Sequence, residues 1–206
     1  MKRSNRPTTP KRPRRPRAPA WLQGGCHCGR VRFRIRIEHK AALDCNCEIC
    51  VKKGNLHLLV ADRDFELLSG QESLAVYTFG ARIAQHHFCR RCGIHPFYRP
   101  HSPPDPTLWD VNMRCLDKVA LSDFRIEPLD GAGIEATVVA ALKASVPRRG
   151  LVRRYIELCE RGVYDPSMQA ERLEISGEEL DELVGRIQRN VSSIGARLAA
   201  SAEEPT

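Results

Sequence analysis

The sequence predicts a mainly β domain of small antiparallel sheets, with a disordered N-terminal tail before it and a C-terminal α-helical extension after it. Three observations support this fold class: a proline-rich basic start, short stretches in which apolar residues alternate, and a late stretch with apolar residues three and four positions apart. We expect the tail over residues 1–20, the β domain over 21–130 and the helical extension over 131–206. A chain of 206 residues has room for one such domain with additions.

The tail accounts for the excess positive charge of the chain. The chain has 33 Lys and Arg against 25 Asp and Glu, a net charge of +8, and residues 1–20 hold eight of the positive residues and no acid. Prolines recur at every third position from Pro7 to Pro19, a pattern that favours extended polyproline II and cannot bury a core. Such a tail suits an arm that contacts nucleic acid, a ligand for proline-reading domains, or a solubilising extension.

Neither membrane insertion nor export is predicted. No stretch approaches the roughly 20 apolar residues that a membrane helix needs. The tail has no apolar segment of the kind that a secretory signal requires, and its prolines forbid the amphipathic helix of a mitochondrial presequence. We therefore expect a cytoplasmic protein without membrane contact.

Cysteine spacing points to metal. Seven of the nine cysteines lie in tight clusters, at positions Cys26, Cys28, Cys45, Cys47, Cys50, Cys89 and Cys92. Cysteines two or three residues apart can aim two thiolates at one ion about 2.3 Å away, whereas disulfide frameworks usually spread their cysteines. A reducing compartment and tetrahedral zinc fit this pattern best. We expect the other two cysteines, Cys115 and Cys159, to be buried as small hydrophobic residues.

Counting the clustered cysteines suggests one closed and one open metal site. A closed zinc site takes four thiolates, and one short loop can wrap Cys45, Cys47 and Cys50 around a second ion. That division leaves the pairs Cys26/Cys28 and Cys89/Cys92 for the closed site. Three protein ligands and an exchangeable fourth position are typical of catalytic zinc. Alternatively, a histidine completes the second site and makes both ions structural; the candidates are His27, His57, His87 and His95.

The first predicted strand has one apolar and one basic face, because four apolar residues from Val31 to Ile37 alternate with four arginines from Arg30 to Arg36. Turn-forming residues separate five further strand candidates, at residues 56–60, 74–79, 84–88, 95–99 and 108–113.

Two helices are predicted in the C-terminal extension. Residues 151–159 have a helical pattern, and Ser176 with Glu179 matches a capping box. An amphipathic helix of about six turns follows the box, with apolar residues from Leu180 to Leu198. We expect this helix to pack on its own domain, to cover the zinc cleft, or to pair with a second chain in a homodimer.

Four segments contain the cysteine motifs and their flanks: Gly-Gly-Cys-His-Cys-Gly at 24–29, Cys-Asn-Cys-Glu-Ile-Cys at 45–50 with Lys-Lys-Gly at 52–54, Phe-Cys-Arg-Arg-Cys-Gly-Ile-His-Pro-Phe at 88–97, and Val-Asn-Met-Arg-Cys-Leu-Asp at 111–117. In order, spacing and flanks they resemble the glutathione-dependent formaldehyde-activating enzyme and centromere protein V family, over roughly residues 22–128. The resemblance implies a zinc-binding β-tent fold with two Zn2+ per chain. It places a structural zinc on Cys26, Cys28, Cys89 and Cys92, and a catalytic zinc on Cys45, Cys47 and Cys50.

The resemblance also implies a reaction, the addition of glutathione as co-substrate to formaldehyde, which makes the protein a zinc-dependent carbon–sulfur lyase. Its partners would be a small-molecule thiol and an aldehyde. Glutathione is anionic, so Lys52 and Lys53 are candidates to bind its carboxylates, as are Arg90, Arg91 and the arginines of the first strand. His95 is a candidate proton shuttle or partner of a thiolate. The alternatives are a zinc-stabilised module that binds nucleic acid through residues 1–20, and an interaction scaffold.

Overall fold

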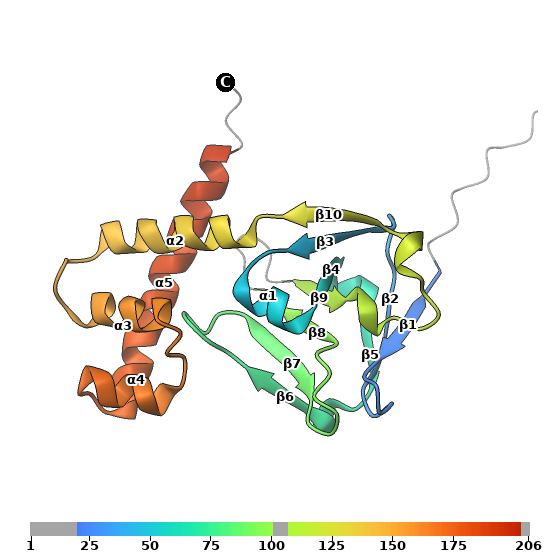
Figure 1. Ribbon diagram of the computed structural model, residues 1–206, viewed down its shortest axis with the longest axis horizontal. Helices are drawn as coiled ribbons and strands as arrows, with labels where there is room; N and C mark the ends of the chain where they lie inside the picture. The colour runs from blue at the N-terminus through green and yellow to red at the C-terminus, as the bar shows by residue number, and fades with distance from the viewer. Residues whose placement is uncertain (1–19, 101–106, 203–206) are drawn as a thin grey trace, which may run out of the picture.

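A computed structural model describes residues 20–100 and 107–202 (Figure 1). The expected disordered tail, apart from Ala20, lies outside the described residues. The described chain forms a β body and, beside it, a group of helices built from the C-terminal third (Figure 1). A mainly β domain with a helical C-terminal extension is therefore confirmed.

Two sheets make up the β body. The smaller has strands in the order β1 (Leu22–Gly25), β2 (Arg32–Ile35), β5 (Phe65–Ser69). The larger has seven strands in the order β10 (Arg125–Leu129), β3 (Ala41–Cys45), β4 (Leu56–Ala61), β9 (Leu108–Asn112), β8 (Phe97–Arg99), β7 (Gln85–Cys89), β6 (Leu74–Tyr77). Single 3-10 turns lie at Asp62–Asp64, Gln71–Ser73, Met113–Cys115 and Leu121–Asp123.

One pairing departs from the expected antiparallel arrangement. β10 runs parallel to β3, with Leu129 opposite Cys45, whereas all the other strand pairs are antiparallel. Parallel neighbours need a long connection between them, and about 80 residues separate β3 from β10 in the chain. Because of this pairing, the chain enters the helical extension directly beside Cys45.

The first predicted strand has the two faces that its alternation indicates. Val31, Phe33 and Ile35 are buried in the core, where the Phe33 ring packs against those of Phe65 and Phe97. On the other face Arg32, Arg34 and Arg36 are half-buried and form ion pairs, described below, whereas Arg30 is exposed.

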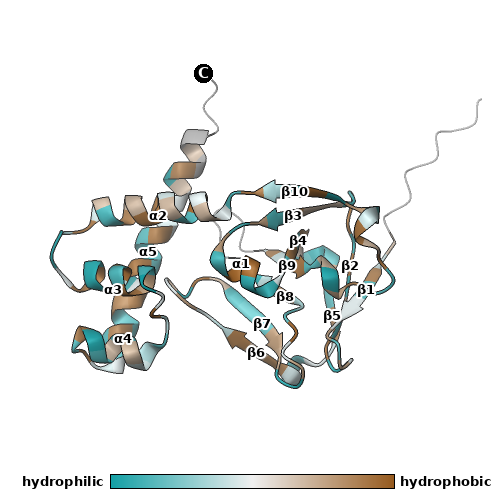
Figure 2. Ribbon diagram, viewed as in Figure 1, coloured by the Kyte–Doolittle hydropathy of each residue, from teal (hydrophilic) through white to brown (hydrophobic). Residues whose placement is uncertain are grey.

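The helical extension consists of α2 (Gly131–Ser145), α3 (Leu151–Glu160), α4 (Pro166–Leu173) and α5 (Gly177–Ala202). The predicted capping box is present, since Glu179 N donates to Ser176 Oγ and Ser176 N donates to Glu179 Oε2. Helices α3, α4 and α5 each carry both hydrophobic and hydrophilic residues (Figure 2). Their apolar residues form a second core, separate from that of the β body.

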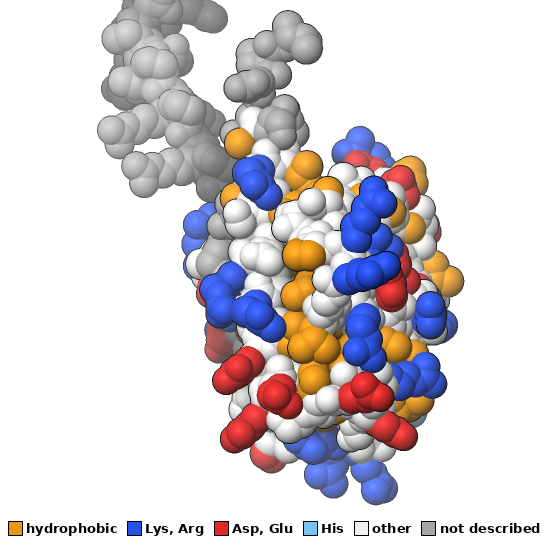
Figure 3. Space-filling view, turned by 90° about the vertical axis from the view of Figure 1, so that its left-hand side faces the viewer, with side chains coloured by type: hydrophobic (Ala, Val, Ile, Leu, Met, Phe, Trp, Pro, Cys, Tyr) orange, Lys and Arg blue, Asp and Glu red, His pale blue; other side chains and the backbone are white. Residues whose placement is uncertain are grey.

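The apolar face of α5 packs inside the chain, in the second core formed by the helices of the extension and not in the core of the β body. Leu180, Leu183 and Ile187 are almost fully buried in the second core. Some hydrophobic side chains stay visible among charged ones on the outer end of the extension (Figure 3). Pairing of two chains through α5 stays a prediction. Among the described helices, none has the length and apolar character that a membrane crossing requires.

The extension is attached to the β body at residues 80–82. Tyr155 Oη donates to the carbonyl oxygen of Gly80 at 2.6 Å, and Arg82 forms an ion pair with Asp181 at 2.7 Å.

Candidate functional site

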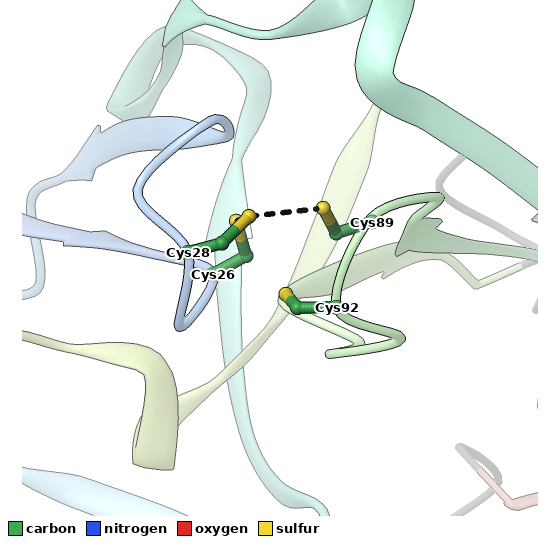
Figure 4. A group of neighbouring side chains, drawn as sticks. All are labelled: Cys26, Cys28, Cys89 and Cys92. Carbon is green, nitrogen blue, oxygen red and sulfur yellow. Dashed lines mark hydrogen bonds between the residues drawn. The ribbon is translucent and has the colours of Figure 1, made fainter.

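Four of the predicted ligands lie together at the boundary between the two sheets (Figure 4). Cys26 and Cys28 come from the turn between β1 and β2, and Cys89 and Cys92 from the turn after β7. Their Sγ atoms all lie within 4.8 Å of one another, with Cys28 3.5 Å from Cys26 and 3.7 Å from Cys89. Thiolates about 2.3 Å from a tetrahedral zinc would stand about 3.8 Å apart. The four-sulfur group therefore has the spacing that zinc requires.

The four-sulfur group lies where a bound ion would connect the two sheets. Cys26 and Cys28 lie in the turn that joins two strands of the three-stranded sheet, whereas Cys89 ends β7 of the seven-stranded sheet and Cys92 follows it. Cys89 is fully buried, and Val31 N donates to Cys26 Sγ at 3.3 Å, which fixes that sulfur within its turn. An ion bound by all four sulfurs would join the two sheets.

The other three predicted ligands form a second group. Cys45 ends β3, Cys47 precedes α1 (Glu48–Lys53), and Cys50 lies within that helix. Their Sγ atoms also lie within 4.8 Å of one another. The helix ends at Gly54 with φ 61, a left-handed conformation that glycine adopts without strain. This turn returns the chain to β4, so the three sulfurs stay at the edge of the sheet.

The three-sulfur group has the donor chemistry of a metal site. Burial raises the pKa of the Cys45 and Cys50 thiols. Three sulfurs this close, two of them on buried cysteines, would repel one another as thiolates, and a bound divalent cation removes that penalty. All nine cysteines are free thiols. Among the described residues, no His, Asp or Glu and no further Cys joins either group.

A row of buried polar side chains crosses the seven-stranded sheet. In neighbouring strands, His86 is paired with Tyr98, and Tyr98 with Asp110. His57 lies beside Asp110, with Nδ1 2.8 Å from Oδ2, and its Nδ1 is 3.5 Å from Tyr98 Oη. The ring of His95 is 5.6 Å from that of His86 and 5.9 Å from that of Tyr98, centroid to centroid. We call these five residues the buried polar row.

Two imidazoles of the buried polar row, those of His86 and His95, stay uncharged. Burial lowers the pKa of His86 to about 3 and that of His95 to about 2, and the Lys53 charge acts in the same direction. Burial also raises the pKa of Tyr98 well above its usual value, and nearby Asp110, Cys50 and Cys45 raise it further. The tyrosine hydroxyl therefore stays protonated. Both ring nitrogens of His86 and of His95 are buried without a hydrogen-bond partner among the described residues.

The three-sulfur group also acts electrostatically on the row and on Lys53. Cys45 and Cys50 raise the pKa of Tyr98, and Cys50 and Cys47 raise the pKa of Lys53 against the larger lowering by burial. The Lys53 Nζ is buried without a hydrogen-bond partner among the described residues, and burial lowers its pKa to about 8. Buried polar atoms without partners are uncommon and often mark a place where another molecule binds. The Lys53 ammonium is therefore a candidate place for a ligand to bind, and both it and Tyr98 interact electrostatically with the three sulfurs.

The two lysines predicted to bind glutathione differ in environment. Lys53 is buried as described, whereas the Lys52 side chain is 69% exposed and pairs with Glu48. The other predicted cations are engaged elsewhere or exposed. Arg90 Nε donates to the carbonyl oxygen of Leu74, and Arg91 is exposed. The first-strand arginines Arg32, Arg34 and Arg36 pair with Asp117, Glu66 and Asp64.

Most of the buried polar row was missed by sequence reasoning. Only His95 was singled out there as a proton carrier, and His57 only as a metal ligand. A signal was present for two of its members, because His57 and Asp110 each interrupt a mostly apolar predicted strand, at residues 56–60 and 108–113. Cys115 and Cys159 are partly buried against the first and second cores, as expected of small hydrophobic residues.

Comparison with known proteins agrees with the motifs. A family model described as "Glutathione-dependent formaldehyde-activating enzyme" matches residues 21–128. A curated Halomonas elongata protein named "Putative glutathione-dependent formaldehyde-activating enzyme" is 37% identical over 82 residues, which cover 34% of this chain and 51% of that protein. The chain thus spans about half the length of this relative. A crystal structure of a Rhodobacter sphaeroides protein is 31% identical, with a TM-score of 0.47 over 52% of this chain and 97% of that chain.

Proposed function

The chain belongs to the glutathione-dependent formaldehyde-activating enzyme family, and on this basis we propose that it adds the thiol of glutathione to formaldehyde. In this reaction the S–H bond breaks and a C–S bond forms, while the carbonyl electron pair moves to oxygen, which takes a proton. The product is S-hydroxymethylglutathione, and its cleavage in the reverse direction is a carbon–sulfur lyase reaction.

One observation carries this proposal: the three-sulfur group is separate from the four-sulfur group, and two of its cysteines, Cys45 and Cys50, act electrostatically on Tyr98 of the buried polar row. We propose that the four-sulfur group holds a structural zinc and that Cys45, Cys47 and Cys50 hold a second zinc. Three protein ligands leave one position for exchange. A zinc ion in such a site lowers the pKa of a bound thiol or polarises a carbonyl oxygen.

The buried polar row supplies the hydrogen bonds for this addition. Tyr98 Oη, protonated at working pH, donates toward the oxygen on which charge develops. His57, held by Asp110, orients the Tyr98 hydroxyl. The neutral ring of His95 carries a proton by accepting it at one nitrogen and releasing it from the other, since neither nitrogen is engaged by the described protein.

Lys53 is the proposed anchor for the anionic substrate. Its buried ammonium lies near the sulfurs and has no carboxylate partner among the described residues, so a glutathione carboxylate would satisfy it. Lys52 already pairs with Glu48 and is exposed, so we propose no such role for it.

The test is the exchange rate between free glutathione with formaldehyde and their adduct, measured by NMR with substoichiometric protein, because the adduct also forms unaided. We expect acceleration by the wild-type protein and loss of it in Cys47→Ser. Cys159→Ser, outside both sulfur groups, is the matched control and should keep the rate. Wild-type protein that carries two zinc ions and gives no acceleration would contradict the proposal.

A further inference from the structure

The helical extension reaches the three-sulfur group through Asn46. Asn46 N donates to the carbonyl oxygen of Leu129 at 3.2 Å, and Asn46 Nδ2 donates to Asp130 Oδ1 at 2.8 Å. Ala132 N, in the first turn of α2, donates to Asn46 Oδ1 at 2.9 Å. The residue between Cys45 and Cys47 is therefore fixed to the segment that enters α2.

Gly131, the first residue of α2, lies directly on Cys45. A Cβ atom built at position 131 would be 2.3 Å from Cys45 Sγ and 3.4 Å from Cys47 Cβ. Non-bonded heavy atoms in contact stand about 3.5 to 4 Å apart, so even a methyl group would overlap the sulfur. Glycine is required here for space, because it lets the backbone approach the sulfur.

We propose that Gly131 is a positioning residue of the three-sulfur metal site and that the start of α2 forms one wall of that site. The inference rests on the proposed zinc site at Cys45, Cys47 and Cys50. It goes beyond the family resemblance because the family match ends at residue 128, before α2 begins. The wall holds the sulfurs of Cys45 and Cys47 in place, and it closes that side of Cys45 to an incoming thiol or aldehyde.

Hydrogen bonds hold the start of α2 in its position against Cys45. Asp130 both caps α2, by accepting from Gly133 N at 3.0 Å, and accepts from Asn46 Nδ2. A shift of α2 away from Cys45 would therefore break the bonds to Asn46 as well. Groups that hold metal ligands in place typically contribute about 10- to 100-fold to metal affinity.

The experiment is a titration of the metal-free full-length protein with Zn2+ against a chromophoric chelator, which gives the number of ions and the affinity of each. We expect wild type to bind two ions. Gly131→Ala should bind one with wild-type affinity and the second about 10- to 100-fold more weakly. Gly185→Ala is the matched control, because a Cβ there meets nothing closer than Arg189 at 3.7 Å, and it should bind both ions like wild type.

A second variant covers the case in which Gly131→Ala fails to fold and loses both ions. Asp130→Ala removes the acceptor of Asn46 Nδ2 without placing an atom near sulfur, and it should weaken only the second ion. If either folded variant binds two ions with wild-type affinity, the proposal that α2 forms a wall of the site is wrong. Wild-type protein that binds a single ion would instead overturn the proposed metal site itself, so the two failures are distinguishable.

Discussion

His57 on β4 and Asp110 on β9 form a buried hydrogen-bonded pair, with Nδ1 2.8 Å from Oδ2 and both side chains 3% exposed. Burial raises the pKa of Asp110, and the hydrogen bond from His57 opposes that shift. The pair lies at one end of the buried polar row, beside Tyr98. The hydrogen bond to Asp110 fixes the orientation of the His57 ring inside the β body.

We predict that Asp110→Ala lowers the free energy of unfolding by about 3 kcal/mol, because it leaves His57 buried without its acceptor. Asp181→Ala is the matched control, since the Asp181 side chain is 73% exposed and its pair with Arg82 lies at the surface. That variant should cost less than about 1 kcal/mol. Urea unfolding of the two variants checks the difference, and equal losses would contradict it.

Stability should fall as the pH is lowered below about 6.5. His86 and His95 have folded-state pKa values of about 3 and 2, whereas an unfolded histidine titrates near 6.5. Between these values the unfolded chain takes up protons that the folded protein does not bind. Each histidine therefore contributes stability that is present above about pH 6.5 and is lost toward pH 3, by about 1.4 kcal/mol per pH unit.

Replacing one of these histidines isolates its contribution. His95→Gln should make the fall in unfolding free energy between pH 6 and pH 4.5 shallower by about 1.4 kcal/mol per pH unit. The slope is the readout, so a change in overall stability does not affect the test. His39→Gln, at an exposed position, should keep the wild-type slope. An unchanged slope in His95→Gln would mean that the imidazole is not held neutral.

The two sulfur groups should differ in their contribution to stability. Cys28 is exposed, so Cys28→Ser costs little packing, yet it removes a ligand from the ion proposed to join the two sheets. We expect the melting temperature to fall by about 10 °C or more. Cys47→Ser, in the three-sulfur group, should lower it by less than half of that. Calorimetry on zinc-loaded samples compares them, and a larger loss in Cys47→Ser would reverse the assignment of roles.

Removing the Lys53 charge should weaken the binding of glutathione. Lys53→Gln loses a charge-assisted hydrogen bond in a buried site, so we expect KM for glutathione to rise about tenfold. Lys52→Gln, one residue away and exposed, should leave KM unchanged. A rise in KM in Lys52→Gln alone would exclude Lys53 as the anchor.

The sequence was sufficient to predict elements with regular alternation. The six predicted strands correspond to β2, β4, β6, β7, β8 and β9, and the capping box at Ser176 correctly predicted the start of α5. Four strands were missed, β1, β3, β5 and β10. Two of them clearly lack that pattern: β1 is Leu-Gln-Gly-Gly, and β10 contains Pro128, which is tolerated at the edge of a sheet. Their pairing depends on contacts between distant residues.

The candidate site was predictable to the extent that its ligands are neighbours in sequence. The short sequence spacing within the cysteine clusters indicated the metal ligands, because residues two or three positions apart must lie close together. The contact of Gly131 with Cys45 could not be predicted, since it depends on the parallel pairing of β10 with β3. The buried polar row likewise forms only when β4, β9, β8 and β7 lie in that order.

We propose that the three-sulfur group binds the metal on which adduct formation depends. The most direct measurement is the NMR exchange rate between free glutathione with formaldehyde and their adduct, recorded while metal-free protein is titrated with Zn2+. We predict that the first equivalent fills the four-sulfur group without acceleration and that acceleration rises with the second equivalent. Full acceleration after one equivalent, or none after two, would contradict this division of roles.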